Sequence, residues 1–400
     1  MPEVEHGVGV LVVGAGAGGS ACAEALREGG YEGSILMVGR DVDPPYDRPS
    51  VTKNYLSGES SREETYLHPA DWWAEQGVEL RIRTSVMQLD TELRAATLSD
   101  KTVVSFEHAV LATGANVRRL RVDGGQLEGI QYVRTLGNSE AIRAAADAAS
   151  HVVIVGGSYI ACEVAATLTS RGSSVTMVAE EALPLSRGFG DTAGAHFRDV
   201  LVGHGVEWVG GDPLGAFEGS GERVEAVLTA SGRRIAADAV VLGTGVTPDV
   251  MLARSAGLDL GERGGVRCSE RLESSVPGIW VAGDACEYES VIHGRPMRIE
   301  HWEVARGQGA AVARGILGSE QAFDDIPYFW SDLSDWASLE YVGPAERWDQ
   351  EVVRGSVTDG EFSIFYLDGG RVAGALSVGR GDDLDIARRH LADPTLPVEL

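Results

Sequence analysis

Cysteine is scarce in this chain, and the few cysteines lie far apart in the sequence. The four cysteines, Cys22, Cys162, Cys268 and Cys286, form no CxxC or CxxxxC pair. This spacing excludes a dithiol redox centre and a cysteine-rich metal site, and we expect no bound metal. Cys22 and Cys162 fall in expected helices, where cysteine usually serves as a small buried hydrophobic residue.

Lysine is scarcer still, and positive charge as a whole is outnumbered. Lys53 and Lys101 are the only two lysines among 34 basic residues, which face 60 acidic residues and give a formal net charge of −26. This acidity argues against a nucleic-acid-binding protein. The net charge is still compatible with an acidic protein partner. Salt screens charges beyond about 8 Å, so a local basic patch would be enough to bind such a partner. Since a compact ammonium differs from a planar guanidinium, Lys53 is a candidate functional residue.

Long apolar runs are missing as well. No stretch approaches the roughly 18 residues of a membrane span. Glu3 and Glu5 precede only a short apolar run, unlike the basic start of a secretory signal. We therefore expect a cytoplasmic protein without membrane association. With 400 residues, 44% of them hydrophobic, the chain is long enough for two or three globular domains.

A glycine-rich turn near the amino terminus organises the first part of the chain. The apolar run 10–13 predicts a buried strand, and residues 20–27 predict the helix that follows. The first glycine permits the turn, the second lets the backbone approach phosphate oxygens, and the third lets helix and strand pack. Plain strand-to-helix packing uses the same pattern. The candidate phosphate-binding residues are Gly14, Ala15, Gly16 and Gly19.

The second predicted strand, 34–38, is followed by Arg40 and Asp41, where a ribose-binding carboxylate is expected. Asp41 has the right charge, whereas Arg40 lies closer to the strand end, so both are candidates. The proline-rich segment 43–53 is predicted to be a loop until Ser50, and a solvated loop with incidental charges is the alternative to a functional one.

The same strand, turn and helix return about 140 residues later. The strand 151–155 precedes a turn in which Ser158 occupies the usual place of the middle glycine, with Gly156 before it and Ala161 in the third position. A helix through Leu168 and a strand over 174–178 complete this second unit. Two such units predict two bound nucleotides.

The end of the second unit is acidic. Glu180 and Glu181 follow the strand, although the ribose position could instead fall on Ala179. With no arginine recognised there to receive a 2′-phosphate, this end favours NADH over NADPH. Three further strand ends carry candidate residues: Thr113 and Gly114, Gly245, and Asp284. Asp284 alone could be a helix cap, but with the units upstream it is predicted to bind the ribityl chain of a flavin nucleotide.

The ordered set GxGxxG, PYDRPxxxK, ATG, GGSYIAxE, GTGVTPD, VAGDA, EHWEVA and FWSD resembles the FAD-dependent pyridine-nucleotide reductases that serve ferredoxins and rubredoxins. It is most similar to the ferredoxin reductase components of Rieske dioxygenase and haem monooxygenase systems, which are related to apoptosis-inducing factor. The resemblance implies an α/β fold with two Rossmann-like domains, arranged as in glutathione reductase. The implied domains are a discontinuous FAD domain at 1–114 and 246–322, an NAD domain at 115–245 and a small α+β domain at 323–400.

The resemblance also implies the cofactor contacts. The first glycine turn would hold the FAD pyrophosphate, Arg40 or Asp41 the adenosine ribose, and Arg48 the phosphates. Val86 would contact adenine through its main chain, and Trp302 would lie beside the flavin ring. The implied FAD set, with the ATG turn, is Gly14, Ala15, Gly16, Gly19, Arg40, Asp41, Arg48, Lys53, Val86, Thr113, Gly114, Arg134, Asp284 and Trp302. Gly245, in the GTG turn, is a further cofactor-binding candidate. The implied NADH set is Gly156, Ser158, Tyr159, Ile160, Glu163 and Glu180.

Lys53 and Glu163 match a lysine and a glutamate that in the family meet near the flavin N5, and they are the implied catalytic residues. A buried carboxylate is tolerable there only if it is paired, and it could also accept a hydrogen bond from the nicotinamide amide. The alternative is that Glu163 faces solvent on its helix.

The implied reaction passes a hydride from NADH to FAD and then single electrons to a [2Fe–2S] ferredoxin or a rubredoxin-like protein that serves a monooxygenase or dioxygenase. Related thiol enzymes carry a cysteine where this chain has Pro49, Ser50, Thr52 and Lys53, so a thiol relay is not expected. Two rivals remain: a reductase of a quinone, a radical or oxygen, and a redox-sensing interaction protein like apoptosis-inducing factor. A monomer or weak homodimer is expected.

The last domain is where partner choice would lie. Its opening motif has Leu333 where the family commonly has glutamine. Trp330 and Trp336 are either part of an electron exit surface or core aromatics. Four arginines near the EHWEVA motif are either a ferredoxin-facing basic patch or scattered solvated residues: Arg295, Arg298, Arg306 and Arg314.

Overall fold

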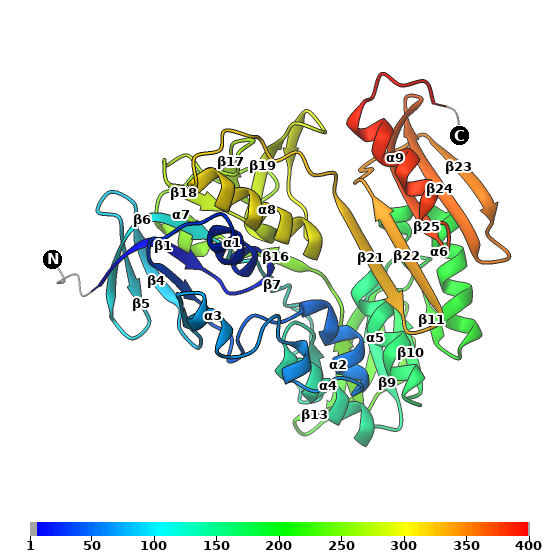
Figure 1. Cartoon of the computed structure of the whole chain (residues 1–400). Helices are drawn as coiled ribbons and strands as arrows, with labels where there is room; N and C mark the ends of the chain where they lie inside the picture. The colour runs from blue at the N-terminus through cyan, green and yellow to red at the C-terminus, as the bar shows by residue number, and fades with distance from the viewer. Residues whose placement is uncertain (1–5, 399–400) are drawn as a thin grey trace. The chain divides into compact units, whose positions relative to one another are not determined.

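The computed structural model describes residues 6–398 and divides into two compact units (Figure 1). Unit 1 comprises the described part of Met1–Arg48 together with Thr65–Asn116 and Thr247–Phe329. Unit 2 comprises Pro49–Glu64, Val117–Val246 and the described part of Trp330–Leu400. No helix in the described range combines the length and the hydropathy needed to cross a membrane.

Unit 1 is built around a seven-stranded sheet of order β3-β2-β1-β6-β5-β4, with β18 also paired to β6. The strands β3, β2, β1, β6 and β18 are parallel to one another. Parallel strands are covered on both faces, which explains why their sequences are continuously apolar. β4 and β5 extend the sheet as an antiparallel ribbon. The strands are β1 (His6–Val13), β2 (Ile35–Val38), β3 (Val78–Arg81), β4 (Val86–Asp90), β5 (Ala95–Leu98), β6 (Val103–Leu111) and β18 (Ile279–Val281).

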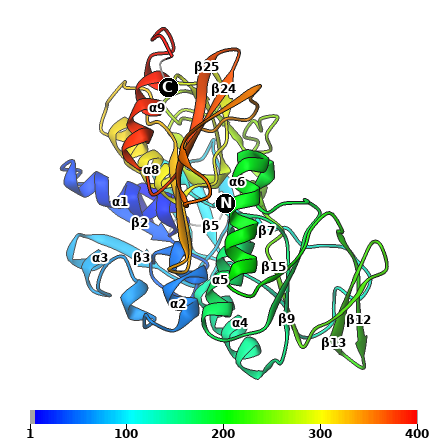
Figure 2. The ribbon, with the colours of Figure 1, turned by 90° about the vertical axis from the view of Figure 1, so that its right-hand side faces the viewer.

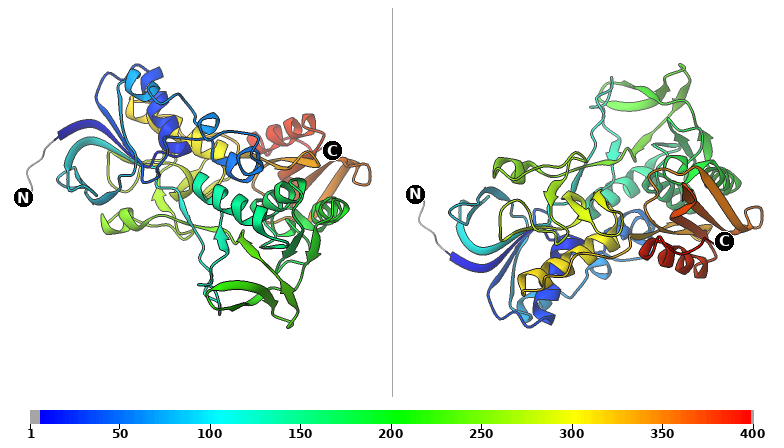
Figure 3. Two further views of the ribbon diagram at one scale, coloured as in Figure 1. Left: turned by 90° about the horizontal axis from the view of Figure 1, so that it is seen from below. Right: turned by 90° about the horizontal axis from the view of Figure 1, so that it is seen from above.

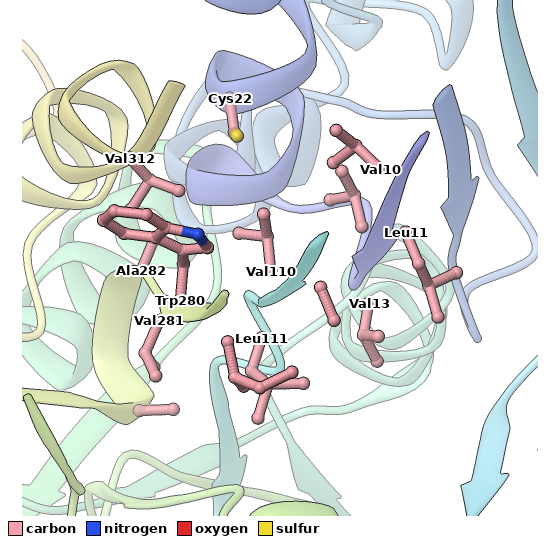
Figure 4. Packing of buried hydrophobic residues seen from close by; sticks show 14 of the residues in the cluster. Val10, Leu11, Val13, Cys22, Val110, Leu111, Trp280, Val281, Ala282 and Val312 are labelled. Carbon is pink, nitrogen blue, oxygen red and sulfur yellow. The ribbon is translucent and has the colours of Figure 1, made fainter. Parts of the chain in front are cut away.

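Two helices, α1 (Ala17–Glu28) and α8 (Trp302–Ile316), pack against each other beside this sheet (Figures 1 and 3). They approach so closely that a Cβ on Gly309 would collide with the carbonyl oxygen of Gly18. Figure 4 shows Val110, Trp280 and Val312 packed between the sheet and these helices. The other elements of unit 1 are α3 (Trp72–Glu75), α7 (Met251–Ser255), β17 (Val266–Cys268), η3 (Gly283–Ala285), β19 (Cys286–Ser290) and β20 (Arg295–Met297). A short 3-10 helix, η2 (Glu63–Thr65), spans the boundary between the units.

Unit 2 contains a second parallel sheet, of order β11-β10-β9-β15-β8. A small antiparallel sheet, β12-β13-β14, lies beside it (Figure 2). The strands are β8 (Ile130–Tyr132), β9 (Val152–Val155), β10 (Val175–Val178), β11 (Glu207–Val209), β12 (Leu214–Ser220), β13 (Arg223–Thr229), β14 (Arg234–Ala236) and β15 (Ala239–Leu242). The helices are α2 (Asn54–Ser57), α4 (Leu136–Ala148), α5 (Tyr159–Ser170) and α6 (Ser186–Gly203).

The end of the chain forms a five-stranded sheet of order β21-β22-β25-β24-β23, with α9 (Asp382–Ala392) packed on it (Figure 2). Its strands are β21 (Tyr328–Leu333), β22 (Ala337–Val342), β23 (Gln350–Ser356), β24 (Glu361–Asp368) and β25 (Arg371–Val378). Within unit 2 it is tied to α6 by a hydrogen bond from the Tyr366 hydroxyl to the Phe189 carbonyl oxygen at 2.8 Å.

The predicted fold class is confirmed: two parallel α/β sheets of the nucleotide-binding kind and a C-terminal α+β part are all present. The boundaries of three separate domains stay a prediction, since the C-terminal sheet groups with the second parallel sheet in unit 2. The boundary between the units falls within β7 (Ala115–Val117) and β16 (Val246–Pro248). One local prediction was wrong: a 3-10 helix, η1 (Arg48–Thr52), begins before Ser50, because proline is tolerated in a first helical turn.

Candidate functional site

The first glycine turn lies between β1 and α1, as its sequence predicts. Gly14 has a φ of +110°, and a Cβ there would collide with the Ala112 carbonyl oxygen. A Cβ on Gly19 would collide with Gly14 itself. At Gly16, in contrast, no atom lies within 4 Å of where a Cβ would be. Two glycines are thus required by the packing, while the middle one borders open space.

That open space fits a pyrophosphate. Gly16 is the N-cap of α1, and no side chain caps the helix. The first turn of α1 contains no acidic residue that would oppose an anion. The amides at this helix start and the room beside Gly16 together match what the diphosphate of FAD requires.

Three strand ends meet beside this turn. β1, β6 and β18 are neighbouring parallel strands, so Gly14, Thr113 and Asp284 follow their carboxyl ends at one edge of the sheet. The Thr113 hydroxyl donates to the Asp249 carbonyl oxygen at 2.6 Å, which fixes the ATG turn. Next to Asp284, the Gly283 amide donates to the Gln308 side chain at 2.8 Å. This edge thus brings together three of the predicted FAD residues, Gly14, Thr113 and Asp284.

Asp41 and Arg48 lie against each other in unit 1. The Arg48 guanidinium is 3.2 Å from the Asp41 carboxylate and stacks on the Tyr46 ring. Burial opposes the charge of Arg48, but the acidic groups of Tyr46, Asp41 and Asp284 outweigh it and raise the pKa of the guanidinium. Asp284 is thus one of the acidic groups whose charge acts on Arg48.

Arg40, the other candidate for the ribose position, contacts a different set of residues from Asp41. Its guanidinium contacts the Asp249 carboxylate at 2.9 Å and donates to the Asn116 side chain at 2.7 Å. This ion pair joins the end of β2 to the segment that follows β16. Asp41 is thus paired with Arg48, while Arg40 holds the end of β2 in place through its ion pair with Asp249.

The remaining FAD candidates divide between the units. Val86 begins β4, and the Thr84 amide just before it donates to the Gly39 carbonyl oxygen at 2.9 Å, which keeps this segment beside the end of β2. Trp302 is the half-buried first residue of α8. The preceding residue, His301, is neutral, because burial lowers its pKa to about 4. Arg134 and Lys53 belong to unit 2.

The second glycine turn is equally well formed. Gly156 has a φ of +127°, and a Cβ there would collide with the Gly243 carbonyl oxygen. Ser158 is the N-cap of α5, but its hydroxyl donates to the Gly243 carbonyl oxygen at 3.2 Å and does not cap the helix. The serine side chain is therefore directed away from the first amides of α5. Gly245 has a φ of +84° and also borders open space.

These features fit a second dinucleotide, because the helix start is left to an anion and the neighbouring strand end leaves room beside it. Tyr159 and Ile160 are half-buried in the first turn of α5. The acidic end of the unit differs from the prediction in one respect. Arg187 lies 2.9 Å from Glu181 and 3.7 Å from Glu180, so an arginine does stand beside the ribose position.

Lys53 and Glu163 meet in unit 2. The Lys53 Nζ lies 2.6 Å from Glu163 Oε1, and their side chains are 20% and 3% exposed. Glu163 is thus buried and paired, which is the condition under which a carboxylate is tolerated in an interior. The solvent-facing alternative for Glu163 is wrong. The catalytic roles of the two residues stay a prediction.

Two hydroxyl groups that were not predicted complete this cluster. Thr52 donates to Glu163 Oε2 at 2.5 Å, and Ser331 donates to Glu163 Oε1 at 2.6 Å. Asp332 lies 4.0 Å from the Lys53 Nζ. The carboxylate of Glu163 is thus contacted by one ammonium group and two hydroxyl donors. The only sequence signal for Ser331 and Asp332 was their place in the FWSD motif.

Substitution Ser331→Ala is expected to lower the free energy of unfolding by about 1–3 kcal/mol, because a buried, charged acceptor loses one donor. Ser338→Ala is the matched control: Ser338 donates to Asp332 at 2.7 Å, but at an exposed position, and should cost less than about 0.5 kcal/mol. Denaturant unfolding of both variants measures the difference. Equal costs for the two serines would contradict the buried network.

The four cysteines are free and buried. Burial raises the pKa of the Cys22 thiol to about 12 and raises the pKa of Cys162 and of Cys268 as well. Thiols held protonated in this way are poor nucleophiles, which supports the absence of a thiol relay.

A disulfide reagent such as dithionitrobenzoate, applied to the native protein near pH 8, is therefore expected to label none of the four cysteines within minutes. In guanidinium chloride all four should react. One cysteine that reacts rapidly in the native protein would contradict the description of these thiols as buried packing residues.

Two of the four arginines in the predicted partner surface form ion pairs with acidic residues. Arg298 pairs with Glu300 at 2.6 Å and Arg306 pairs with Glu24 at 3.0 Å, so these two charges are neutralised locally. Leu333 is fully buried. In unit 2, Trp336 stacks on His204 with the ring centroids 4.2 Å apart. Whether any of these residues meets a partner stays a prediction.

The chain is similar to known proteins along almost all of its length. Residues 8–309 match the model of the pyridine nucleotide-disulphide oxidoreductase family, and residues 328–398 match a reductase C-terminal family. It is 34% identical to putidaredoxin reductase of Pseudomonas putida, over 98% of this chain and 93% of that protein. It is 33% identical to the ferredoxin–NAD(+) reductase component of the anthranilate 1,2-dioxygenase system of Burkholderia cepacia, over 97% and 95%.

Among solved structures, the covalent complex of putidaredoxin reductase with putidaredoxin contains a chain with a TM-score of 0.92 and 34% identity, over 99% of this chain and 95% of that one. The ferredoxin reductase of the CYP199A2 system from Rhodopseudomonas palustris has a TM-score of 0.91 and the same identity, over 95% and 93%. This chain therefore belongs to the pyridine nucleotide-disulphide oxidoreductase family and, with these relatives, to its ferredoxin reductases.

Proposed function

We propose that this chain is an FAD-dependent NADH:ferredoxin oxidoreductase, which takes a hydride from NADH and passes single electrons to a small [2Fe–2S] ferredoxin of a monooxygenase or dioxygenase system. The observation that carries the proposal is the nearly full-length similarity to ferredoxin reductases of oxygenase systems. One such relative has been captured in a complex with putidaredoxin. The two open glycine turns, one in each unit, supply the two nucleotide sites that the reaction needs.

In unit 1, the amides at the start of α1 would bind the diphosphate of FAD. Asp284 would accept hydrogen bonds from the ribityl hydroxyls, and Arg48 would add its charge to the phosphates. Gly16 leaves the space that lets the backbone approach. Bound FAD would supply both the hydride acceptor and the one-electron donor.

In unit 2, the amides at the start of α5 would bind the diphosphate of NADH. The Glu163 side chain is fixed in place by an ion pair with Lys53 and by hydrogen bonds from Thr52 and Ser331. A carboxylate fixed in this way would accept a hydrogen bond from the nicotinamide carboxamide and orient the ring. Lys53 would keep the Glu163 charge neutralised while the nicotinamide excludes water.

The test uses the purified yellow protein and measures cytochrome c reduction with NADH and, separately, NADPH. A rate that prefers NADH and depends strongly on added [2Fe–2S] ferredoxin supports the proposal. Fast turnover with quinone or oxygen and no stimulation by several different ferredoxins would point to a reductase of small acceptors. Very slow reduction by NADH under all conditions would favour a redox-sensing interaction protein.

We further place the protein in the cytoplasm, as a monomer or weak homodimer. Sedimentation of the holoprotein across a range of concentrations tests the oligomeric state.

A further inference from the structure

A short loop after β10 is fastened to the second glycine turn. The Leu185 amide donates to the Gly157 carbonyl oxygen at 2.8 Å. The Trp208 indole donates to the Ala182 carbonyl oxygen at 2.9 Å and holds the loop from its other side. Leu185 has a φ of +63° and is the N-cap of α6. The loop therefore places the first residues of α6 beside the turn.

Three charged side chains meet on this loop. The Arg187 Nη2 lies 2.9 Å from Glu181 Oε1 and 3.7 Å from Glu180 Oε2. Arg187 and Glu180 are 72% and 74% exposed, whereas Glu181 is only 21% exposed. The second oxygen of Glu181 lies 3.4 Å from the position that a Cβ on Gly157 would take. The carboxylate of Glu181 thus reaches back to the turn and holds the guanidinium beside it.

In a Rossmann unit, the side chains just after the second strand meet the adenosine ribose, and a nearby arginine there accommodates a 2′-phosphate. Arg187 has the planar donor fork that suits phosphate. Glu181 contacts Arg187 Nη2 at 2.9 Å, and Glu180 lies 3.7 Å from the same atom, beyond hydrogen-bond distance. The two carboxylates and the guanidinium together carry a net negative charge, which opposes the added charge of a 2′-phosphate. The acidic neighbours of Arg187 therefore oppose the binding of a 2′-phosphate, and hence of NADPH, to this arginine.

We propose that Glu181 and Glu180 set the choice of NADH over NADPH by holding Arg187, which is a latent receptor for a 2′-phosphate. The inference rests on the proposed function, because it requires that the second glycine turn binds a pyridine dinucleotide. Glu181, the less exposed acid, fixes the guanidinium over the turn. Glu180, the exposed acid, would accept hydrogen bonds from the ribose hydroxyls of NADH and repel a 2′-phosphate.

The test measures binding rather than turnover. ADP-ribose and 2′-phospho-ADP-ribose are titrated into the FAD-loaded protein by calorimetry, for the wild type, for the E180Q/E181Q variant and for the triple variant that adds R187L. Glutamine keeps the size of each side chain and removes its charge. We expect the wild type to prefer ADP-ribose. The double variant should shift the affinity ratio toward 2′-phospho-ADP-ribose by at least about tenfold, as one charged hydrogen bond to phosphate would.

The triple variant should lose this gain, and added salt should weaken the gain in the double variant. An unchanged ratio in the double variant would overturn the inference, and so would a gain that persists without Arg187. In both cases the wild type still binds ADP-ribose, so the NADH site stands. Failure of the wild type to bind either ligand would overturn the inference and the proposed NADH site together.

Discussion

Substitution Lys53→Ala is expected to slow flavin reduction by NADH about a hundredfold, a loss typical of removing one fixed charged donor from an active site. The FAD content should fall much less, because the residues proposed to contact the diphosphate and the ribityl chain lie in unit 1 while Lys53 belongs to unit 2. Anaerobic stopped-flow absorbance at the flavin band measures the rate, and the flavin-to-protein absorbance ratio measures the content.

The same substitution should lower the free energy of unfolding by about 3 kcal/mol, the lower end of the range for breaking a buried pair, because Thr52 and Ser331 still donate to Glu163. A double variant, Lys53→Met with Glu163→Gln, should recover much of this stability but not the rate. Lys101→Ala is the matched control, since Lys101 is the other lysine of the chain and is exposed. An unchanged reduction rate in Lys53→Ala would remove the catalytic role.

Substitution Gly16→Ala is expected to produce a folded protein that binds FAD at least about tenfold more weakly. No atom lies within 4 Å of the new methyl group, and Gly16 has a φ of −87°, which alanine adopts without strain. The stability of the apoprotein should therefore change by less than about 1 kcal/mol. The methyl group would instead occupy the space beside the start of α1 that the pyrophosphate needs. FAD titration of the apoprotein, followed by fluorescence quenching, measures the affinity.

Substitutions at two other glycines serve as controls for Gly16→Ala. Gly14→Ala should compromise folding of unit 1, because Gly14 has a φ of +110° and its Cβ would collide with Ala112. Gly203→Ala, at the end of α6 with no atom near its Cβ, should leave FAD binding unchanged. If Gly16→Ala binds FAD as tightly as Gly203→Ala does, the first turn is a packing feature and not a phosphate site.

The parts of the structure that the sequence predicted are those in which one contiguous stretch carries the whole signal. A strand, a glycine turn and a helix follow one another within about 20 residues, so both glycine turns could be recognised from local patterns. Because parallel strands end at one edge of a sheet, the convergence of Gly14, Thr113 and Asp284 also follows once the order of the strands is known.

Contacts between distant segments were harder to foresee. The approach of Lys53 to Glu163 was implied only by the family resemblance, and neither local pattern contains it. Ser331 reaches Glu163 from the C-terminal sheet, which no periodicity could reveal. The choice between Arg40 and Asp41 depended on partners elsewhere in the chain, Asp249 for one and Arg48 for the other.

The position of Arg187 shows a different limit. No arginine occurs among the residues that directly follow the strand, so the local sequence predicts an acidic end without a receptor for a 2′-phosphate. The loop turns back at Leu185 and returns the start of α6 to the glycine turn, so a residue several positions further on lies beside Glu181. A loop that folds back has no sequence period, and only the structure brings these charges together.

The most direct test of the central claim is the electron count between NADH and ferredoxin. Under anaerobic conditions, a catalytic amount of the holoprotein is mixed with limiting NADH and excess oxidised [2Fe–2S] ferredoxin, and the bleaching of the ferredoxin is measured at completion. Because a hydride carries two electrons and the ferredoxin accepts one, the proposed function predicts two ferredoxin molecules reduced per NADH. NADH consumption that leaves each of several ferredoxins oxidised, and that proceeds only when quinone or oxygen is supplied, would contradict it.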